Sequence, residues 1–396
     1  MGQVKIGILS NTVSKANSVH RVHDTLDNII DRENAKDFVQ HVCVGRANVE
    51  DPSFEQLVGL YTPAVRKLVE EEKVDVLAID GGDGTAHIVY SVLMHMYKNN
   101  PRQIPAVVHM RGGTINYIAD STGVPKRSPL RWIPHQLTQI PVIGKYLLFK
   151  REHAPEYVLK QLLEKCRDLT PEDMRKYHMR KMYLLKIDDN TKANKKPKKY
   201  GLLAAFGAPY NFLEKYYDAS TGRPGPYKAL KIIAKGVACA AASPFSRRAR
   251  EYVDSIVRKI DVAVSLDSVP SPHQQYTGLV PTSTDITLKI TPLTIHLSRA
   301  DEQKSTGLQK IYGNYNRIRA FGANVTIPEL LWTFAKIVLP GFTVKETPNI
   351  HNRQVQEIKI TPQRCTIGYS VEGNLYQTAN PIRITPSEIM MPFFQF

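Results

Sequence analysis

The chain has 396 residues, of which 42% are hydrophobic and 23% charged. This composition predicts a folded, soluble protein rather than a disordered one, and no apolar run approaches the roughly 20 residues that span a bilayer. The net charge of +16 is uneven, because residues 126–199 hold 19 Lys and Arg against 8 Asp and Glu. Such a field attracts nucleic acid, anionic lipid or phosphorylated substrates, and composition ranks none of these above a solvated basic surface.

The cysteines are far apart in the sequence and lack the spacing of a metal site. We therefore expect reduced thiols and a cytoplasmic location. The first residues lead directly into the apolar run 4–9, a pattern unlike a secretion signal. Gly2 does not fit a myristoylation signal, because Ile6 stands where that signal requires Ser or Thr.

Residues 1–125 alternate short apolar runs with amphipathic stretches. This alternation is typical of a parallel sheet covered by helices. The strand candidates are residues 4–9, 38–44, 74–79 and 104–110, and the helix candidates are residues 62–71 and 85–96. Near-continuous Val, Ile and Leu in the strand candidates indicates burial on both faces. We expect a doubly wound α/β domain.

The alternation stops at Lys126, where a basic segment punctuated by prolines begins. An amphipathic helix is predicted around residues 156–166. We interpret residues 126–177 as an insertion or as a linker between domains.

The rest of the chain predicts a second domain. Residues 183–187 and 202–206 are strand candidates, joined by a lysine-rich stretch expected at a hairpin tip. Further strands are expected at residues 286–290, 294–297, 355–360, 366–371 and 382–385. We predict a mainly antiparallel β domain over residues 178–385, with a helical insertion at 224–262, and a return of residues 386–396 to the first domain.

The clearest motif is DGGDGT at residues 80–85, which follows a strand candidate and opens a helix candidate. Its glycines can present backbone N–H groups to a phosphate, and the helix N-terminus adds its positive dipole end. The motif is neither the Walker pattern nor the dinucleotide pattern GxGxxG. The alternative is a tight turn in which Asp83 caps the helix.

A second glycine loop, RGGTIN at residues 111–116, also follows a strand candidate. The polar stretch SNT at residues 10–12 follows the first strand. Because the carboxyl ends of parallel strands lie at one edge of a sheet, these loops can converge on one ligand. Taken alone, either stretch is more often an ordinary turn than a binding loop.

The pair of loops resembles a known family. GGDGT after a strand, followed by a later strand that ends in GGTxN, is similar to the catalytic domain shared by diacylglycerol, sphingosine and ceramide kinases. Weaker matches are Asn11, Phe206-Gly207, residues 372–374 (EGN, where the family has Asp-Gly-Glu) and the closing stretch 380–386.

The resemblance implies an active site between an α/β domain and a β-sandwich domain, with ATP and Mg²⁺ as cofactors. The implied reaction is transfer of the γ-phosphate to a lipid hydroxyl, with Asp83 and Glu372 as catalytic residues and Glu372 also as a metal ligand. The implied nucleotide-binding residues are Asn11, Gly81, Gly82, Gly84, Thr85, Gly113, Thr114 and Asn116.

Two positions depart from the family pattern. Tyr117 stands where diacylglycerol kinases usually carry Asp, and Asn374 replaces the last acid of Asp-Gly-Glu. An amide cannot act as a general base, so Asp83 is the expected base. Glu372 could instead be an acid facing solvent at a strand end. The departures leave open a catalytically impaired relative that regulates by binding nucleotide or lipid, and a kinase of a soluble acceptor such as NAD.

A lipid kinase must reach a substrate in a bilayer. Aromatic and basic residues interleave in residues 131–151, and the expected membrane contacts are Trp132, Lys145, Lys150 and Arg151. The alternative is an insertion that packs on the protein and exposes its basic residues to solvent. No nucleic-acid-binding signature is present, so we expect a peripheral membrane protein without a nucleic-acid partner. The oligomeric state stays open, a dimer included.

Overall fold

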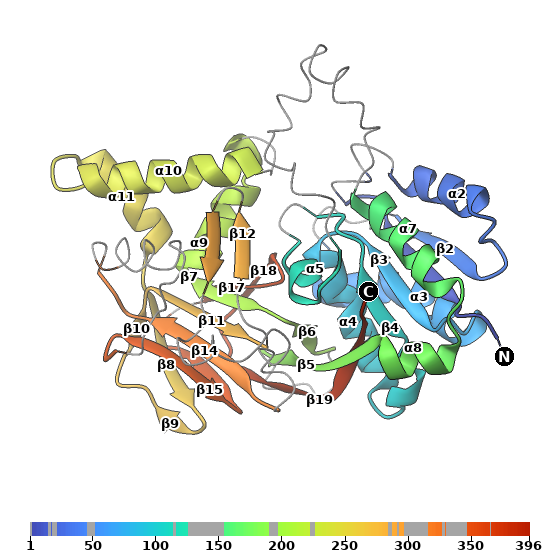
Figure 1. Ribbon diagram of the computed structural model, residues 1–396. Helices are drawn as coiled ribbons and strands as arrows, with labels where there is room; N and C mark the ends of the chain where they lie inside the picture. Colours follow the sequence, from blue (N-terminus) through green and yellow to red (C-terminus); the bar gives the residue numbers. More distant parts are fainter. Residues whose placement is uncertain are drawn as a thin grey trace, which may run out of the picture.

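The computed structural model describes residues 2–14, 17, 22–45, 52–113, 116–125, 154–189, 197–221, 226–283, 287–290, 293–296, 316–326, 329, 347–364 and 366–396. Figure 1 shows an α/β part built around the first strands and, beside it, a β part that carries a pair of projecting helices.

The α/β part is a parallel sheet in the order β4-β3-β1-β2. Its strands are β1 (Ile6–Asn11), β2 (Val39–Val44), β3 (Val76–Asp80) and β4 (Ala106–His109). Its helices are α2 (Val22–Arg32), α3 (Phe54–Arg66), α4 (Asp83–Tyr97), α5 (Tyr117–Ser121), α7 (Ala154–Cys166) and α8 (Pro171–Tyr177), with η1 (Lys67–Glu71) and η2 (Pro101–Gln103). Every residue of β3 and β4 is buried, as their apolar sequences predict.

Helices cover both faces of this sheet. One apolar core holds side chains of α3 and α4, and the other holds side chains of α2 and α7. The helix predicted at residues 62–71 begins earlier, at Phe54, because Ser53 and Gln56 form a capping box there. It continues past Pro63 into the π-helical turn η1.

The β part contains a six-stranded antiparallel sheet in the order β15-β14-β11-β7-β17-β18. Its strands are β7 (Ala204–Gly207), β11 (Gly278–Thr282), β14 (Ile318–Ala323), β15 (Ile350–Val355), β17 (Ile367–Val371) and β18 (Asn374–Thr378). A buried apolar cluster joins this sheet to β5, β8, β16 and β19, so two layers of strands pack face to face. The predicted fold class, an α/β domain followed by an antiparallel β domain, is confirmed.

The facing layer extends the parallel sheet. Its strands are β5 (Met179–Asp188), β6 (Lys199–Gly201), β8 (Ile260–Leu266), β9 (Val269–Pro270), β10 (Gln275–Tyr276), β16 (Ile358–Pro362) and β19 (Ile382–Phe394), and β12 (Thr287–Ile290) pairs with β13 (Leu293–His296) separately. β19 runs antiparallel to β16 and β5, and near its end Phe393 pairs in parallel with Val107 of β4. One strand therefore belongs to both parts.

Two predicted strands are interrupted by carboxylates from distant segments. The strand predicted at residues 202–206 begins only at Ala204, because the N–H groups of Leu202 and Leu203 donate to Glu372. The strand predicted at residues 355–360 is divided between β15 and β16, because the carboxylate of Asp267 accepts hydrogen bonds from the N–H groups at 356 and 357. Neither break has a signal in the local sequence.

The helical stretch between β7 and β8 consists of α9 (Ala208–Tyr217), η5 (Ala219–Thr221), α10 (Pro226–Ala242) and α11 (Arg247–Val257). β5 forms a hairpin with β6, which lies within the stretch predicted as the tip. The predicted second strand, residues 202–206, is therefore wrong as the partner of β5, because its residues from Ala204 form β7 in the six-stranded sheet. Most of the lysine-rich tip of the hairpin, residues 190–196, lies outside the described residues.

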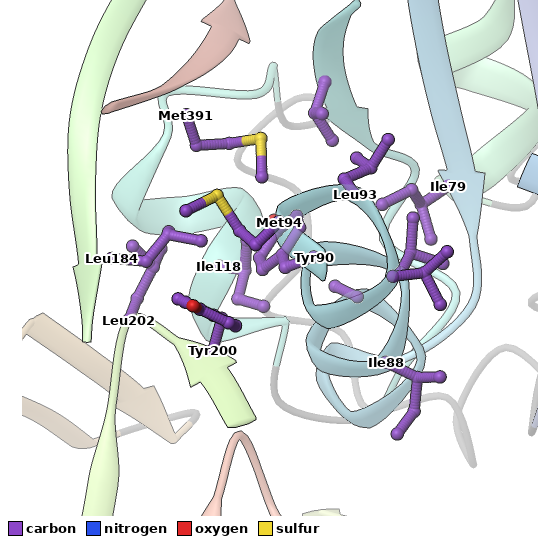
Figure 2. Close-up of a cluster of buried hydrophobic side chains, with 14 of the residues drawn as sticks. Ile79, Ile88, Tyr90, Leu93, Met94, Ile118, Leu184, Tyr200, Leu202 and Met391 are labelled. Atoms are coloured by element: carbon purple, nitrogen blue, oxygen red, sulfur yellow. The ribbon is translucent and has the colours of Figure 1, made fainter. Parts of the chain in front are cut away.

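A core shared by the two parts fixes helix α4. Figure 2 shows Tyr90 and Met94 of α4 beside Leu184 and Leu202 from the β5–β6 region, with Ile79 of β3 on the other side of the helix. All five side chains belong to one buried cluster. The helix that follows the glycine motif is therefore held by apolar packing from both sides.

The same junction contains a buried ion pair. The ammonium group of Lys199 lies 2.9 Å from a carboxylate oxygen of Asp189 and 4.9 Å from the ring centre of Tyr376. Burial alone would raise the pKa of Asp189, but Lys199 and the hydroxyl of Tyr369 outweigh it and lower that pKa. The pair joins β5–β6 to β17 and β18.

We predict that Asp189→Asn lowers the free energy of unfolding at neutral pH by about 3 kcal/mol, because it leaves the buried Lys199 unpaired. An Asp with a lowered folded-state pKa adds stability above its unfolded pKa of about 3.9, and this stability is lost as pH falls through the folded pKa. Urea denaturation below about pH 4 should therefore show the wild type losing more stability than the variant.

Asp188→Asn is the matched control, since Asp188 pairs with Lys198 in a more exposed position. Its expected cost is about 1 kcal/mol or less. Equal costs for the two variants would contradict a stabilising role of the buried pair.

Candidate active site

The two glycine loops touch through their backbones. A Cβ atom on Gly113 would lie 2.8 Å from Cα of Gly82, and one on Gly112 would lie 2.9 Å from N and O of Gly81. Real Cβ atoms do not approach backbone atoms this closely, so a side chain at either position would push the loops apart. The loops predicted from adjacent strand ends thus meet at the start of α4.

Gly82 is the N-cap of α4, and Asp83 is the first helical residue. Gly82 has extended backbone angles, and its carbonyl accepts hydrogen bonds from N–H of Thr85 at 2.9 Å and of Ala86 at 3.2 Å. The first N–H groups of a helix have no partner within the helix, and the positive end of the helix dipole lies there. The alternative in which Asp83 caps the helix is wrong, because Gly82 occupies that position.

Asn116 fastens the second loop. It has a left-handed φ of 54°, its Oδ1 accepts a hydrogen bond from N–H of Gly113 at 2.9 Å, and its Nδ2 donates to the Gly113 carbonyl at 3.0 Å. Asn tolerates the left-handed conformation better than most residues. The side chain predicted to bind nucleotide therefore shapes the loop, while Thr114 lies outside the described residues.

The end of β1 also reaches the first loop. Asn11 donates a hydrogen bond from Nδ2 to Oγ1 of Thr85 at 2.8 Å. The Thr85 side chain in turn lies against Gly81, where a Cβ atom would come within 2.6 Å of it. Three segments predicted to share one edge of the sheet are thus connected.

Asp83 lies between the second loop and the end of β4. Its Oδ1 accepts a hydrogen bond from N–H of Ile118 at 3.2 Å and lies 3.7 Å from Nε2 of His109. Burial lowers the pKa of His109, which favours the neutral imidazole. Nδ1 of this ring accepts from N–H of Arg111, so the ring proton belongs on Nε2, which faces Asp83.

His109 was missed in the sequence analysis. Its only signal is a polar residue at the end of an apolar strand candidate, and a lone histidine there is compatible with many structural roles.

Residues after β17 reach the same place from the β part. Asn374 donates a hydrogen bond from Nδ2 to the carbonyl of Gly84 at 3.2 Å, and a Cβ atom on Gly84 would overlap the Asn374 side chain. A side chain at position 84 would therefore displace the side chain of Asn374, a residue near the other end of the chain. The residue that departs from the Asp-Gly-Glu pattern contacts the first glycine loop directly.

Glu372 is buried, and one of its two carboxylate oxygens is hydrogen-bonded to backbone N–H groups. Its Oε1 accepts hydrogen bonds from N–H of Leu202 and Leu203, and its Oε2 has no hydrogen-bond partner among the described residues. Burial, followed by the negative charge of Asp83, raises the pKa of Glu372 well above its usual value. The alternative of an acid that faces solvent is wrong, because only 4% of Glu372 is exposed.

The donor set is compatible with a Mg²⁺ ion that also binds phosphate. No cluster of three or more His, Cys, Asp or Glu side chains is found in the described part of the chain. Mg²⁺ in phosphate-transfer sites is commonly held by one or two carboxylates together with the substrate phosphates. The unpartnered Oε2 of Glu372 and the carboxylate of Asp83 are the groups that would hold it.

A second buried acid lies beneath the first loop. Asp80 accepts hydrogen bonds at Oδ2 from Oγ of Ser10 at 2.7 Å and from Nδ2 of Asn17 at 2.8 Å. Ser10 also lies 2.8 Å from Nε2 of His41, whose Nδ1 is 2.7 Å from a carboxylate oxygen of Asp27. Burial raises the pKa of Asp80. This polar chain ties β1 and β2 to the base of the glycine motif.

Some predicted functional residues fall outside the description. Trp132, Lys145, Lys150 and Arg151, the predicted membrane contacts, are not among the described residues. Within the described part, no helix combines the length and the apolar character needed to cross a membrane.

We predict that Gly113→Ala weakens ATP binding by at least about tenfold, because the new Cβ would force apart two backbones that must jointly face the phosphates. Titration with a fluorescent ATP analogue would measure the change.

Gly59→Ala is the matched control, since a Cβ atom on Gly59 meets nothing within 4 Å. In the interior of α3 it should leave nucleotide binding unchanged and raise stability by up to about 1 kcal/mol. Unchanged ATP affinity in Gly113→Ala would show that the contact of the loops is not needed.

Comparison with known proteins finds one family match and several similar structures. Residues 11–140 match the family model described as the diacylglycerol kinase catalytic domain. A diacylglycerol kinase from Bacillus anthracis str. Sterne has a similar structure, with 10% identity and a TM-score of 0.51 over 99% of this chain and 97% of that one. A second structure from the same organism, described as a candidate diacylglycerol kinase, has 12% identity and a TM-score of 0.53 over 99% and 97% of the two chains.

At this identity the structural likeness shows the fold alone, and a search of curated proteins finds no match. The resemblance carried by the two glycine loops is nevertheless confirmed by the family match, because both loops lie within the matched residues 11–140.

Proposed function

We propose that the chain is an ATP-dependent lipid kinase, which transfers the γ-phosphate to a hydroxyl of diacylglycerol, a sphingoid base or ceramide at a membrane surface. The observation that carries the proposal is the position of Asp83. It begins the helix behind the glycine loops, and Asn374 of the β part contacts the next residue, Gly84. A base at this position is next to the phosphate-binding loops and to the second domain.

The phosphate side of the proposal rests on backbone groups. Phosphoryl transfer has a loose transition state, so catalysis consists mainly of holding the phosphates in line with the acceptor and stabilising charge. The N-terminus of α4 supplies preorganised N–H groups for this task, and the loop held by Asn116 packs against it. Mg²⁺, when bound, would neutralise charge on the β- and γ-phosphates, and Asp83 and Glu372 are the groups proposed to hold it.

The acceptor side rests on Asp83. In the proposed step its carboxylate takes the proton of the lipid hydroxyl, the hydroxyl oxygen bonds to the γ-phosphorus, and the bond from that phosphorus to the bridging oxygen breaks to release ADP. Nε2 of His109 lies 3.7 Å from Asp83 Oδ1, and burial lowers the pKa of this histidine, which favours a neutral ring beside the carboxylate. Asn374 cannot replace this base, because an amide does not accept a proton at neutral pH.

The second candidate is a nucleotide-binding relative without turnover, and the observation that favours it is Asn374. An amide covers Gly84 at the position where the family carries a carboxylate. Nucleotide binding without transfer to any acceptor would favour this function over the kinase.

We predict that Asp83→Asn lowers phosphate transfer by about 100-fold or more, the usual contribution of a positioned general base. The assay would measure transfer of radiolabelled γ-phosphate from ATP, with Mg²⁺, into mixed micelles of diacylglycerol, sphingosine and ceramide. The labelled lipid would also identify the acceptor.

Asp37→Asn is the control, because Asp37 is exposed and precedes β2, at the edge of the parallel sheet opposite the glycine loops. It should leave transfer unchanged. Labelled lipid that persists in Asp83→Asn would contradict the assigned base. ATP binding with no labelled lipid from the wild type would overturn the lipid-kinase proposal, and phosphorylation of a soluble acceptor such as NAD would replace it.

A further inference from the structure

The hairpin of α10 and α11 ends in an exposed apolar tip. We define the hairpin tip as residues 236–250. Phe245 is 93% exposed there, the largest exposure among the large hydrophobic side chains of the described residues, and Val237 is 45% exposed. Figure 1 shows that the two helices extend beyond the β strands on the side away from the α/β part.

The packing of the hairpin does not account for the exposure of Phe245 and Val237. The hairpin is stabilised on its other face, where Ala229 and Ile232 of α10 cluster with Tyr216 and with Ile256 of α11. The turn is also ordered, because Phe245 N–H donates to the carbonyl of Ala242 and Ser246 caps α11. A defined turn therefore holds Phe245 in solvent. Exposing an apolar ring to water is unfavourable, and a binding function would explain why the ring stays exposed.

The charges around the tip are mainly positive, and the nearest acid, Glu251, pairs with Arg247 at 2.8 Å. Residues 226–259 contain eight Lys and Arg but only two Asp and Glu. No charged residue stands between Lys235 and Arg247, and Arg247, Arg248 and Arg250 then follow and are exposed. An uncharged end bordered by cations is the distribution expected of a segment that inserts shallowly into an anionic interface.

This distribution favours a lipid surface over nucleic acid. A nucleic-acid site needs cations along the whole contact to neutralise phosphates, whereas residues 236–246 carry none. A bilayer accepts both features, because an aromatic ring enters the interface while Arg side chains remain at the anionic headgroups.

The hairpin is also connected to the candidate active site. Asn211 of α9 donates a hydrogen bond to the carbonyl of Ile256 at 3.0 Å, and Lys228 of α10 donates to the carbonyl of Asp218 at 2.6 Å. At the end of α9, the hydroxyl of Tyr217 would lie 3.1 Å from a Cβ atom on Gly373, between Glu372 and Asn374. A helix of 17 residues is about 25 Å long, so α10 reaches from this end of α9 to the tip.

We propose that the hairpin tip is the surface by which this protein docks on an anionic lipid bilayer, with Phe245 inserted and Arg247, Arg248 and Arg250 at the headgroups. The biological purpose of docking rests on the proposed lipid-kinase function, whereas the docking itself does not. Binding to the bilayer is therefore measured in the absence of nucleotide and of catalytic turnover.

The test is co-sedimentation of the full chain with vesicles of phosphatidylcholine, with and without phosphatidylglycerol. We predict that the wild type binds the anionic vesicles and that salt weakens this binding. Phe245→Ser should lower the affinity by about tenfold. The double variant Arg247→Gln with Arg248→Gln should lower it by about thirtyfold, from the usual contribution of each cation near an anionic surface.

The chain offers matched controls in the α/β part. Tyr177→Ser removes another exposed aromatic side chain, which is 63% exposed, and Lys98→Gln with Arg102→Gln removes two exposed cations near the end of α4. Both controls should bind anionic vesicles as the wild type does. Circular dichroism and thermal melting would verify that each variant is folded.

Two results with vesicles would overturn the proposal: the wild type does not bind anionic vesicles, or the tip variants bind them as well as the controls do. A third would be a double variant that loses binding to an oligonucleotide but keeps its binding to anionic vesicles. If tip variants lose vesicle binding while the wild type phosphorylates no lipid, the docking surface stands and the proposed function fails. If lipid is phosphorylated and the tip variants bind normally, the function stands and the docking surface fails.

Discussion

The structure of the site depends on the direct contact between two backbones, where Gly82 faces Gly113 and Gly81 faces Gly112. Only glycine allows this approach, and it brings the ends of β3 and β4 together at the first turn of α4. Asn116 then fixes the second loop through both of its polar side-chain atoms, and Asn11 reaches the first loop through Thr85. Groups from several strand ends thereby surround one helix N-terminus, the arrangement that binds anions in many α/β proteins.

Strand pairing and apolar packing connect the β part to this site. β19 pairs with strands of both parts, and the apolar cluster around α4 contains side chains from β5 and from the stretch after β6. The buried pair of Lys199 and Asp189 lies in the same junction, close to the ring of Tyr376 in β18. Such connections limit how far Asn374 can move from Gly84, so the geometry around Asp83 is a property of the whole chain and not of one domain.

The alternation of strands and helices, the antiparallel second part and the convergence of the glycine loops could be predicted from the sequence, because each depends on local patterns. The breaks at residues 202–203 and 356–357 could not, since they are made by the distant carboxylates of Glu372 and Asp267. The role of Gly84 was hidden for the same reason, because Asn374 contacts it from near the other end of the chain. His109 gave too little signal, as a lone buried histidine fits many roles.

The central claim is that the two glycine loops form one nucleotide site, and amide hydrogen exchange measured with and without Mg²⁺ and ATP tests it most directly. The account predicts that ATP slows exchange together in peptides covering residues 81–86 and 112–118. Protection of the first loop alone, at saturating ATP, would show that the second loop does not take part in binding and would contradict the account.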